Sequence, residues 1–261
     1  MFEWDLGAII RPGRAKAGEA DSEGPRFALI MLNQPVKNMA VLHELWKGSC
    51  LRVAADGGAN RLYELSQSTE PNTFDSLDVI IGDLDSLTPE ARTHFESRGA
   101  SVIHDPDQES TDFGKAIAHI RAASGPGPID IAAVGGLGGR VDQGLSQLHH
   151  LYLFQPGAAY ERGRIYLVSE ESVTVQLKPG RHSIRVRRRG AGPEEDVFGK
   201  YVGIVPVGEP SVISTRGLEW DVEDWATAFG GRMSTSNHVL PETECVEVET
   251  SRDVLFTISL K

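Results

Sequence analysis

The residues best suited to chemistry are aspartates that follow or begin predicted secondary-structure elements. Asp83 and Asp85 stand one residue apart directly after the apolar run at 77–81, and Asp112 begins a helix-like segment. A helix N-terminus favours a negative charge, and an ionised carboxylate buried without a partner loses costly hydration. These side chains must therefore face either the protein's own Arg and Lys or a cation and a substrate from outside. Because all three are hard oxygen donors with no His or Cys among them, they favour Mg²⁺ over Zn²⁺.

Polar or glycine-rich segments follow five successive apolar runs of the chain. The runs cover residues 27–32, 51–55, 77–81, 101–104 and 129–134, and the segments after them contain Asn33 and Gln34, Asp56, Asp83 and Asp85, Gln108, and the sequence "GGLGGRVDQ". Open parallel sheets bind ligands at the carboxyl ends of their strands, so this pattern predicts a ligand site there. Turn formation explains any one of these segments, but it explains all of them together poorly.

The glycine-rich segment at 135–140 has the composition of a phosphate-binding loop. Its glycines offer bare backbone N–H groups, and Arg140 adds a planar guanidinium that matches phosphate oxygens. The segment does not fit the dinucleotide-binding fingerprint, because Val141 stands where Gly or Ala is required. No Walker loop ending in Gly-Lys-Ser/Thr occurs either. A nucleotide site in this chain is therefore of another kind.

The pattern of the chain changes near residue 160. Before that point, short apolar runs alternate with helix-like segments, which indicates an α/β domain whose parallel sheet is covered on both faces. The helix-like segments cover residues 59–66, 111–123 and 142–154. After residue 160, short and often alternating runs separated by Gly, Pro and Asn predict an antiparallel β-sandwich or roll. We therefore predict domains at 1–160 and 161–261, with the boundary near 155–163.

Composition limits the classes of function. The chain has 261 residues, with 26 basic and 37 acidic side chains and a net charge of −11. That sign disfavours a general nucleic-acid or anionic-membrane surface, although a local cation can still hold a polyanionic ligand. No stretch of about 20 apolar residues is present to span a bilayer, and the chain starts without the basic leader of a signal peptide. Cys50 and Cys245 are too far apart in sequence to suggest a disulfide framework or a metal cluster. A cytoplasmic location is the resulting expectation.

An ordered series of motifs resembles the thiamin pyrophosphokinase family in its eukaryotic form. The motifs are "ADGGANRLY" at 55–63, "IGDLDS" at 81–86, "DPDQESTDFGKAI" at 105–117, "GGLGGRVDQ" at 135–143, "EESVTVQLKPGRH" at 170–182, "GLEWDV" at 217–222 and "STSNHV" at 234–239. They follow the family's order over roughly residues 27–261, and such a series is far more specific than any single motif. Leu84 and Gly114 depart from the usual pattern, at positions that we do not expect to carry chemistry.

The resemblance implies a homodimer in which each subunit has a Rossmann-like α/β nucleotide-binding domain followed by a β-sandwich for thiamine binding and dimerisation. It implies one-step transfer of the pyrophosphoryl group of ATP to the hydroxyl of thiamine, giving thiamin diphosphate and AMP, with Mg²⁺ as cofactor. The implied catalytic residues and metal ligands are Asp83, Asp85 and Asp112. The implied nucleotide site comprises Asn33, Gln34, Asp56, Gly57, Gly58, Asn60, Gln108, Thr111, Lys115, Gly136, Gly138, Arg140 and Asp142. The implied thiamine site comprises Trp220, Ser234, Ser236 and Asn237.

Several alternatives stay open at this stage. A magnesium-dependent phosphotransferase acting on another small alcohol would use the same acidic and glycine-rich motifs, and a non-catalytic thiamine or nucleotide sensor would share the fold. Those motifs contain no His, so the identity of any general base is open. Trp220 is either a core residue or a flat surface for the aminopyrimidine ring of thiamine, with Asn237 at the edge of that ring. His238 is interpreted as a turn or surface residue, and the loops at 11–25 and 187–196 are assigned no function.

Overall fold

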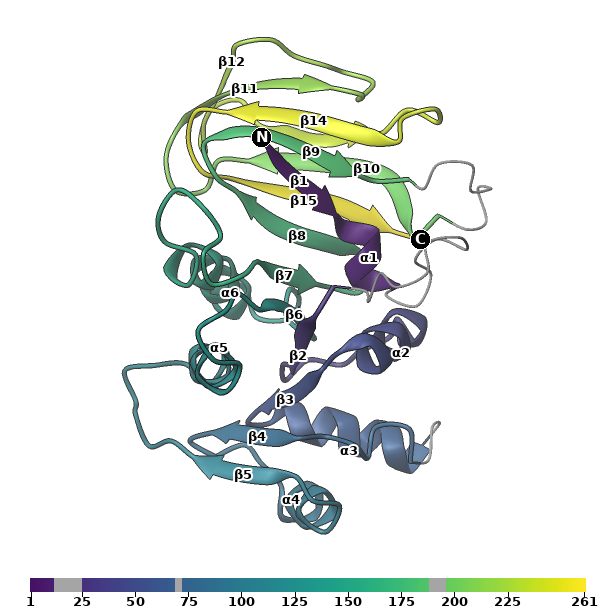
Figure 1. The fold of residues 1–261 in the computed structure, drawn as a ribbon, viewed down its shortest axis with the longest axis vertical. Helices are drawn as coiled ribbons and strands as arrows, with labels where there is room; N and C mark the ends of the chain where they lie inside the picture. The colour runs from purple at the N-terminus through teal and green to yellow at the C-terminus, as the bar shows by residue number, and fades with distance from the viewer. Residues whose placement is uncertain (12–24, 69–71, 188–195) are drawn as a thin grey trace. The chain divides into compact units, whose positions relative to one another are not determined.

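The computed structural model describes residues 1–11, 25–68, 72–187 and 196–261 (Figure 1). These residues fall into two compact units. The α/β unit contains the described parts of Lys16–Pro156 and Tyr160–Glu170, and the β unit contains those of Met1–Ala15, Gly157–Ala159 and Glu171–Lys261. The predicted loops at 11–25 and 187–196 lie largely outside the described residues.

The α/β unit is built on a parallel sheet with the strand order β7-β6-β2-β3-β4-β5. Its strands are β2 Phe27–Met31, β3 Leu51–Ala55, β4 Val79–Gly82, β5 Ser101–His104, β6 Asp130–Val134 and β7 Ile165–Val168. Each one coincides with a predicted apolar run. These runs lack polar alternation because both faces of the sheet are covered, and every residue of β2 is buried. The prediction of a parallel α/β sheet is confirmed.

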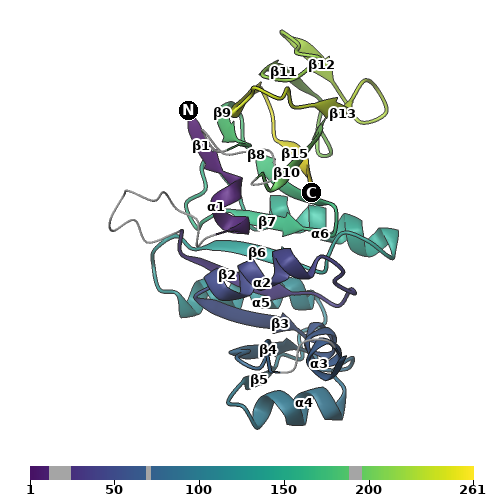
Figure 2. The same cartoon turned by 90° about the vertical axis from the view of Figure 1, so that its right-hand side faces the viewer.

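Helices cover this sheet and carry several of the polar side chains. They are α2 Met39–Gly48, α3 Gly58–Ser68, α4 Pro89–Glu96, α5 Asp112–Ala123 and α6 Val141–Leu153. α5 packs against β2, β3 and β4, and α4 packs against α3 and β5 (Figure 2). The side chains of Asn38, Thr88 and Thr111 cap α2, α4 and α5, respectively, by accepting a backbone N–H. The sequence interpretation missed α2 and α4.

The β unit contains two groups of paired strands, in the orders β1-β9-β14-β11-β12 and β13-β10-β15-β8. The strands are β1 Phe2–Asp5, β8 Ser172–Leu177, β9 Gly180–Arg185, β10 Phe198–Val205, β11 Ser211–Arg216, β12 Trp225–Thr227, β13 Ser234–His238, β14 Cys245–Thr250 and β15 Val254–Leu260, and a short helix, α1, covers Leu6–Ile10. All pairings except β1 with β9 are antiparallel. Buried and exposed residues alternate along β11 and β14, as expected for strands with one face in a core. The predicted C-terminal antiparallel β region is confirmed.

The predicted division at residue 160 differs from the observed units in two places. β7 belongs to the α/β unit because it pairs in parallel with β6. β1 belongs to the β unit because it pairs in parallel with β9, and the indole N–H of Trp4 donates to Nδ1 of His182 at 2.9 Å. Both assignments depend on strand pairing across long sequence separations, which local apolar runs do not reveal.

None of the described helices has the length and apolar character needed to cross a membrane.

Candidate active site

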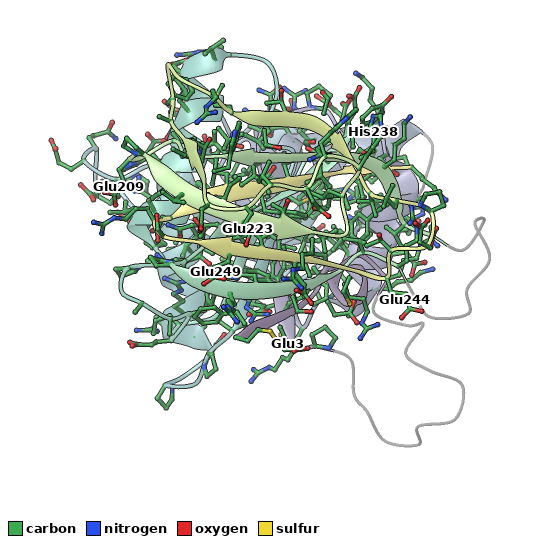
Figure 3. The ribbon with its side chains drawn as sticks, turned by 90° about the horizontal axis from the view of Figure 1, so that it is seen from above. Glu3, Glu209, Glu223, His238, Glu244 and Glu249 are labelled. Carbon is green, nitrogen blue, oxygen red and sulfur yellow. The ribbon has the colours of Figure 1, made fainter. Side chains whose placement is uncertain are left out.

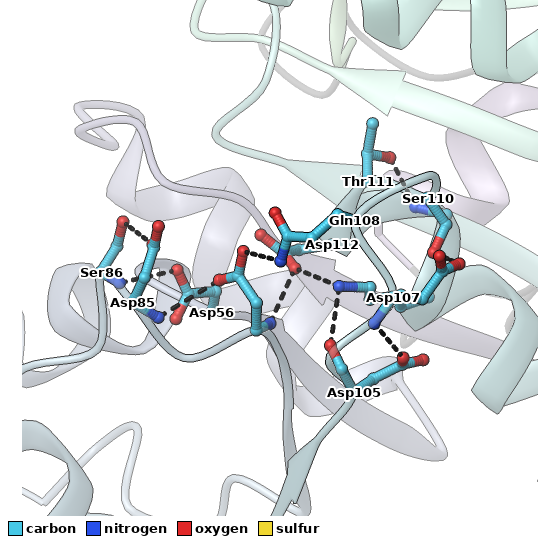
Figure 4. A network of polar contacts seen from close by, with 12 residues as sticks. Asp56, Asp85, Ser86, Asp105, Asp107, Gln108, Ser110, Thr111 and Asp112 are labelled. Atoms are coloured by element: carbon cyan, nitrogen blue, oxygen red, sulfur yellow. Dashed lines mark hydrogen bonds and ion pairs between the residues drawn. The ribbon is translucent and has the colours of Figure 1, made fainter.

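Three aspartates converge at the carboxyl-terminal edge of the parallel sheet. Asp56 follows β3, Asp83 follows β4 and Asp112 is the first residue of α5. One carboxylate oxygen from each lies within 4.8 Å of the others, and we call these residues the three-carboxylate group. Figure 4 shows Asp56 and Asp112 within the polar network around it. Asp83 and Asp112 belong to the predicted metal ligands, and Asp56 belongs to the predicted nucleotide site.

Backbone geometry explains why the carboxylates approach so closely. β3 and β4 are parallel neighbours, so their carboxyl ends lie side by side. Gly82, the last residue of β4, separates two of the aspartates. A Cβ atom at Gly82 would lie 2.8 Å from Oδ1 of Asp112 and 2.8 Å from Cβ of Asp56, which is too close for real atoms. Only glycine therefore allows the group to close around this position.

Burial and mutual repulsion destabilise the charged form of this group. Asp56 is 3% exposed, and its Oδ1 has no hydrogen-bond partner although Oδ2 accepts the N–H of Ser86 at 3.1 Å. Burial raises the pKa of Asp56, and the nearby charge of Asp112 raises it further. Burial also raises the pKa of Asp112, with repulsion from Asp83 adding to the shift. An orphaned, buried carboxylate oxygen of this kind is the position where a cation would relieve the energetic cost.

Asp83 differs from its neighbours because hydrogen bonds stabilise its charge. Its Oδ1 accepts the N–H of Asp85 at 3.2 Å, and this bond lowers the pKa of Asp83. The amide of Gln108 adds a longer hydrogen bond, 3.3 Å, to its Oδ2. The backbone N–H of Asp83 in turn donates to Oδ1 of Asp112 at 3.2 Å. The loop after β4 is therefore tied to the start of α5.

The protein's own cations neutralise only part of the negative charge. Lys115 is 4% exposed, and its Nζ lies 2.9 Å from the carbonyl oxygen of Asp105 and 3.4 Å from Oδ1 of Asp112. Among the described residues, this is the ion pair made to the three-carboxylate group. One ammonium against three carboxylates leaves an excess of negative charge, which favours a cation from outside.

Asp85 occupies a different place from the one predicted. Its carboxylate is exposed, accepts the Ser86 hydroxyl at 2.8 Å and is not part of the three-carboxylate group. Leu84 adopts a left-handed conformation, with φ at 61°, and Asp56 does so as well, with φ at 43°. These backbone turns decide which oxygens point inward, and no sequence pattern revealed them. Asp56, predicted as a nucleotide contact, is the residue that completes the group.

Two predicted nucleotide-site residues hold the loops in place. Asn60 accepts the backbone N–H of Thr88 at 3.0 Å and donates to the carbonyl oxygen of Ser86 at 2.7 Å, so it fixes the loop that follows Asp85. Asn33 accepts a hydrogen bond from Nε of Arg61 at 3.0 Å.

Gly57 and Gly58 are required for close packing. A Cβ at Gly57 would lie 2.3 Å from Nδ2 of Asn33, and one at Gly58 would lie 2.2 Å from the carbonyl oxygen of Met31. Both glycines are buried, so they bring the start of α3 against the end of β2.

The glycine-rich loop after β6 combines packed and open positions. Gly136 is packed, because a Cβ there would lie 2.1 Å from Oε1 of Gln147. Gly138 is exposed, with φ at 154° and no atom within 4 Å of a Cβ position, so its backbone is open to a ligand. The Gln34 side chain lies against Gly139, within 3 Å of a Cβ position there. Arg140 forms two hydrogen bonds with Asp142, at 2.6 and 3.1 Å, and both side chains are exposed.

His150 is a buried polar residue that the sequence interpretation missed. Its Nε2 lies 2.7 Å from Oγ1 of Thr111, the residue that caps α5 immediately before Asp112. His150 stands in α6, outside every quoted motif, so no spacing rule singled it out. Only the structure identifies His150, because its side chain is 3% exposed and contacts the predicted site.

In the β unit, Trp220 is a surface residue. It is 54% exposed, so the core-residue alternative is wrong. Asn237, 5% exposed, holds it from β13: Oδ1 accepts the backbone N–H of Trp220 at 3.1 Å, and Nδ2 donates to its carbonyl oxygen at 2.9 Å. Both ends of this amide therefore make hydrogen bonds inside the protein, and Asn237 orients Trp220. Its contact with an aminopyrimidine stays a prediction.

Other polar residues surround the exposed indole. His238 is labelled in Figure 3. Its ring lies 5.1 Å from that of Trp220 and 5.2 Å from that of Tyr201, and its Nδ1 is 2.5 Å from Oε2 of Glu219. His238 ends β13 and is partly exposed, in accord with a surface interpretation. On the same strand, Ser236 is exposed with φ at 55°, and Ser234 is partly buried. The ring of His238 therefore lies between two exposed aromatic side chains, Trp220 and Tyr201.

Comparisons with known proteins relate both units to one family. The Arabidopsis thaliana protein named thiamine pyrophosphokinase 1 is 37% identical over 255 residues, which cover 92% of this chain and 88% of that protein. The chain belongs to the thiamin pyrophosphokinase family. The rice protein named thiamine pyrophosphokinase 3 is 35% identical over 91% of this chain and 88% of its own length. The crystal structure of yeast thiamin pyrophosphokinase matches all of this chain and 91% of that chain, with a TM-score of 0.84 and 25% identity.

The family profiles divide the chain as the fold does. The profile for the thiamin pyrophosphokinase catalytic domain matches residues 42–161, a range that contains the three-carboxylate group. The profile for the thiamin pyrophosphokinase vitamin B1 binding domain matches residues 181–255, which include Trp220 and Asn237. The resemblance drawn from the motifs is therefore confirmed.

Proposed function

We propose that this chain transfers the pyrophosphoryl group of ATP to the hydroxyl of thiamine, giving thiamin diphosphate and AMP in one step. Membership of the thiamin pyrophosphokinase family makes the chain a transferase of this class. The observation that carries the assignment at the site is the three-carboxylate group, which stands at the ligand-binding edge of a parallel sheet inside the range of the catalytic-domain profile.

Mg²⁺ is the cofactor that we propose for the three-carboxylate group. The donors of the group are all carboxylate oxygens, which suit a hard cation. Oδ1 of Asp56 is buried and accepts no hydrogen bond. Asp56, Asp83 and Asp112 would hold the ion. When bound, Mg²⁺ supplies positive charge that neutralises the phosphate oxygens during transfer.

The remaining polar groups of the α/β unit position the triphosphate in this proposal. The open backbone at Gly138 offers N–H groups to phosphate oxygens. Arg140 is already held by Asp142 in an extended, exposed pair, and its planar guanidinium matches phosphate oxygens. Lys115 keeps Asp112 in place from inside the unit. Attack at the β-phosphorus requires groups on both sides of it, which the loops after β4 and β6 supply from the same edge of the sheet, with β2 and β3 between them.

The β unit supplies the thiamine-binding surface in this proposal. The exposed face of Trp220 is suited to stacking on an aminopyrimidine ring. Asn237 fixes the main chain of Trp220 through two hydrogen bonds and so orients this residue. Ser234 and Ser236 line β13 beside it and offer hydroxyl groups.

We further propose that the working form is a homodimer. α6 exposes Val141, Leu145 and Leu153, which are 77%, 56% and 54% accessible. Exposed apolar side chains gathered on one helix are typical of a protein interface. A partner subunit that covers them would bury this surface. Cytoplasmic location and the absence of nucleic-acid partners stay predictions from composition.

The activity is tested by following the products of ATP and thiamine incubated with the purified chain and Mg²⁺. Pyrophosphoryl transfer yields AMP and thiamin diphosphate in equal amounts. Formation of ADP, or turnover with a different alcohol in place of thiamine, would favour the alternative phosphotransferase. Binding of thiamine or ATP without any product would favour the sensor.

A further inference from the structure

His150 has partners for both nitrogens of its ring. In α6, Nδ1 lies 2.5 Å from the carbonyl oxygen of Ser146, one helical turn earlier. Nε2 lies 2.7 Å from Oγ1 of Thr111. The side chain is 3% exposed, so water does not compete for either contact. A buried imidazole with two partners has a defined proton arrangement.

The chemistry of the partners assigns that arrangement. A carbonyl oxygen only accepts, so Nδ1 carries the proton and donates to Ser146. In the neutral ring Nε2 is then an acceptor, and the hydroxyl of Thr111 donates to it. Burial lowers the pKa of His150, which favours the neutral ring that this pattern requires.

Aromatic neighbours hold the plane of the ring. Phe113 stacks on it with ring centroids 5.0 Å apart, and Phe154 stacks with centroids 5.6 Å apart. The ring also packs closely against α5, since a Cβ at Gly114 would lie at contact distance, 3.4 Å, from Nε2 of His150 and from Oγ1 of Thr111. The imidazole is therefore fixed in position and in orientation.

The contact with Thr111 leads directly to the three-carboxylate group. Oγ1 of Thr111 accepts the backbone N–H of Gly114 at 3.0 Å, which caps α5. Because the hydroxyl proton points to His150, a lone pair of Oγ1 faces Gly114. Asp112 follows Thr111 directly, so the orientation of the Thr111 hydroxyl fixes the backbone position from which the Asp112 side chain extends.

We propose that His150 is a positioning residue for pyrophosphoryl transfer, which orients the Thr111 hydroxyl and thereby keeps Asp112 in the three-carboxylate group. This inference rests on the proposed function. His150 also connects two parts of the site, because α6 follows the glycine-rich loop and α5 carries Asp112. Displacement of a reacting group by 1 Å can cost about a hundredfold in rate, so a loosened cap should cost about tenfold.

Two substitutions separate positioning from packing. His150→Phe keeps a flat ring between Phe113 and Phe154 but loses both hydrogen bonds. His150→Gln loses the ring but keeps an amide oxygen of similar reach to accept from Thr111. We expect His150→Phe to lower kcat about tenfold with the KM for thiamine near that of the parent, and His150→Gln to retain most of the parent kcat. If His150 were needed only for packing, His150→Gln would lose more kcat than His150→Phe. That result would overturn the proposal.

A double-mutant cycle with Thr111→Val tests whether His150 acts through Thr111. In that background His150→Phe should cause no further loss of kcat, because the hydroxyl it orients is gone. Independent, multiplying losses would refute the link. Should His150→Phe not fold, His150→Asn serves instead, since its shorter amide reaches Ser146 but not Thr111.

Mn²⁺ binding, measured by electron paramagnetic resonance without ATP or thiamine, gives a second readout. We expect His150→Phe to weaken it about tenfold and His150→Gln to leave it near the parent value. If the parent protein makes no AMP, the proposed function fails while this comparison still decides the inference. Equal Mn²⁺ binding and equal kcat in the parent and His150→Phe would overturn it.

Discussion

Gly82→Ala provides a direct test of whether the close approach of the aspartates matters. The added Cβ would lie 2.8 Å from Oδ1 of Asp112 and from Cβ of Asp56, whereas ordinary contacts begin at 3.4 Å. Each neighbour must therefore retreat by about 0.6 Å, estimated from these two distances. Ligand distances in metal sites fall within about 0.2 Å of their typical values, and a 1 Å displacement can cost about a hundredfold in rate. We expect kcat/KM to fall about ten- to a hundredfold.

The assay measures AMP formation over a range of Mg²⁺ concentrations, together with thermal unfolding of the same samples. The variant should require more Mg²⁺ for half-maximal rate. Overpacking costs about 1–3 kcal/mol, and each kcal/mol shifts the Tm of a chain of this size by about 2–4 °C. Full parent activity and Mg²⁺ requirement in a variant that melts several degrees lower would refute the reasoning, because the clash would then be relieved without affecting the site.

Gly144→Ala is the matched control for this experiment. Gly144 lies within α6, and no atom lies within 4 Å of a Cβ built there. Alanine is favoured over glycine inside a helix by about 0.8–1 kcal/mol. The control should therefore melt slightly higher than the parent and keep its activity. A comparable loss of activity in both variants would show that the effect is not specific to Gly82.

Three further predictions concern the metal, the thiamine surface and the assembly. Asp112→Asn should lower kcat more than about a hundredfold, because it removes charge from the proposed ion site, while the exposed control Asp224→Asn in the β unit should have no effect. Steady-state rates at saturating Mg²⁺ check this prediction. Near-parent turnover of Asp112→Asn would contradict it. Trp220→Ala should weaken thiamine binding about ten- to two-hundredfold, by analogy with base stacking on aromatic residues, and Trp220→Phe should retain much of the affinity. If calorimetry finds the same thiamine affinity in the parent and in both variants, Trp220 is not part of the site. Leu145→Glu should shift the sedimentation coefficient from that of a dimer to that of a monomer, and a fully active monomeric parent protein would refute the proposed assembly.

Much of the α/β unit could be predicted from local sequence. The apolar runs at 27–32 and 129–134 became β2 and β6 to within one residue, because a strand covered on both faces needs a continuous apolar segment. The strand ends then indicated where polar residues would gather. α4 was missed because a helix of eight residues that buries two side chains carries a weak periodic signal. α2 was missed although its buried Leu42, Leu45 and Trp46 follow helical spacing.

The composition of the site was only partly predictable. Asp83 and Asp112 were expected as partners, but Asp56 takes the third position in place of Asp85. The presence of Asp56 in place of Asp85 depends on the left-handed backbone at Leu84. Hydrogen bonds around the loop offset this local strain. No residue pattern encodes such a turn, because a leucine rarely adopts it unless tertiary contacts impose it.

The sequence by itself determined the strands of the parallel sheet, the family and the presence of acids after those strands. These follow from residue type and spacing along the chain, which act over a few residues. Tertiary structure alone decided that β1 pairs with β9, that Asn237 holds the backbone of Trp220 and that His150 reaches Thr111. Each of these contacts joins residues 17 or more positions apart, and packing of whole elements brings them within hydrogen-bond distance.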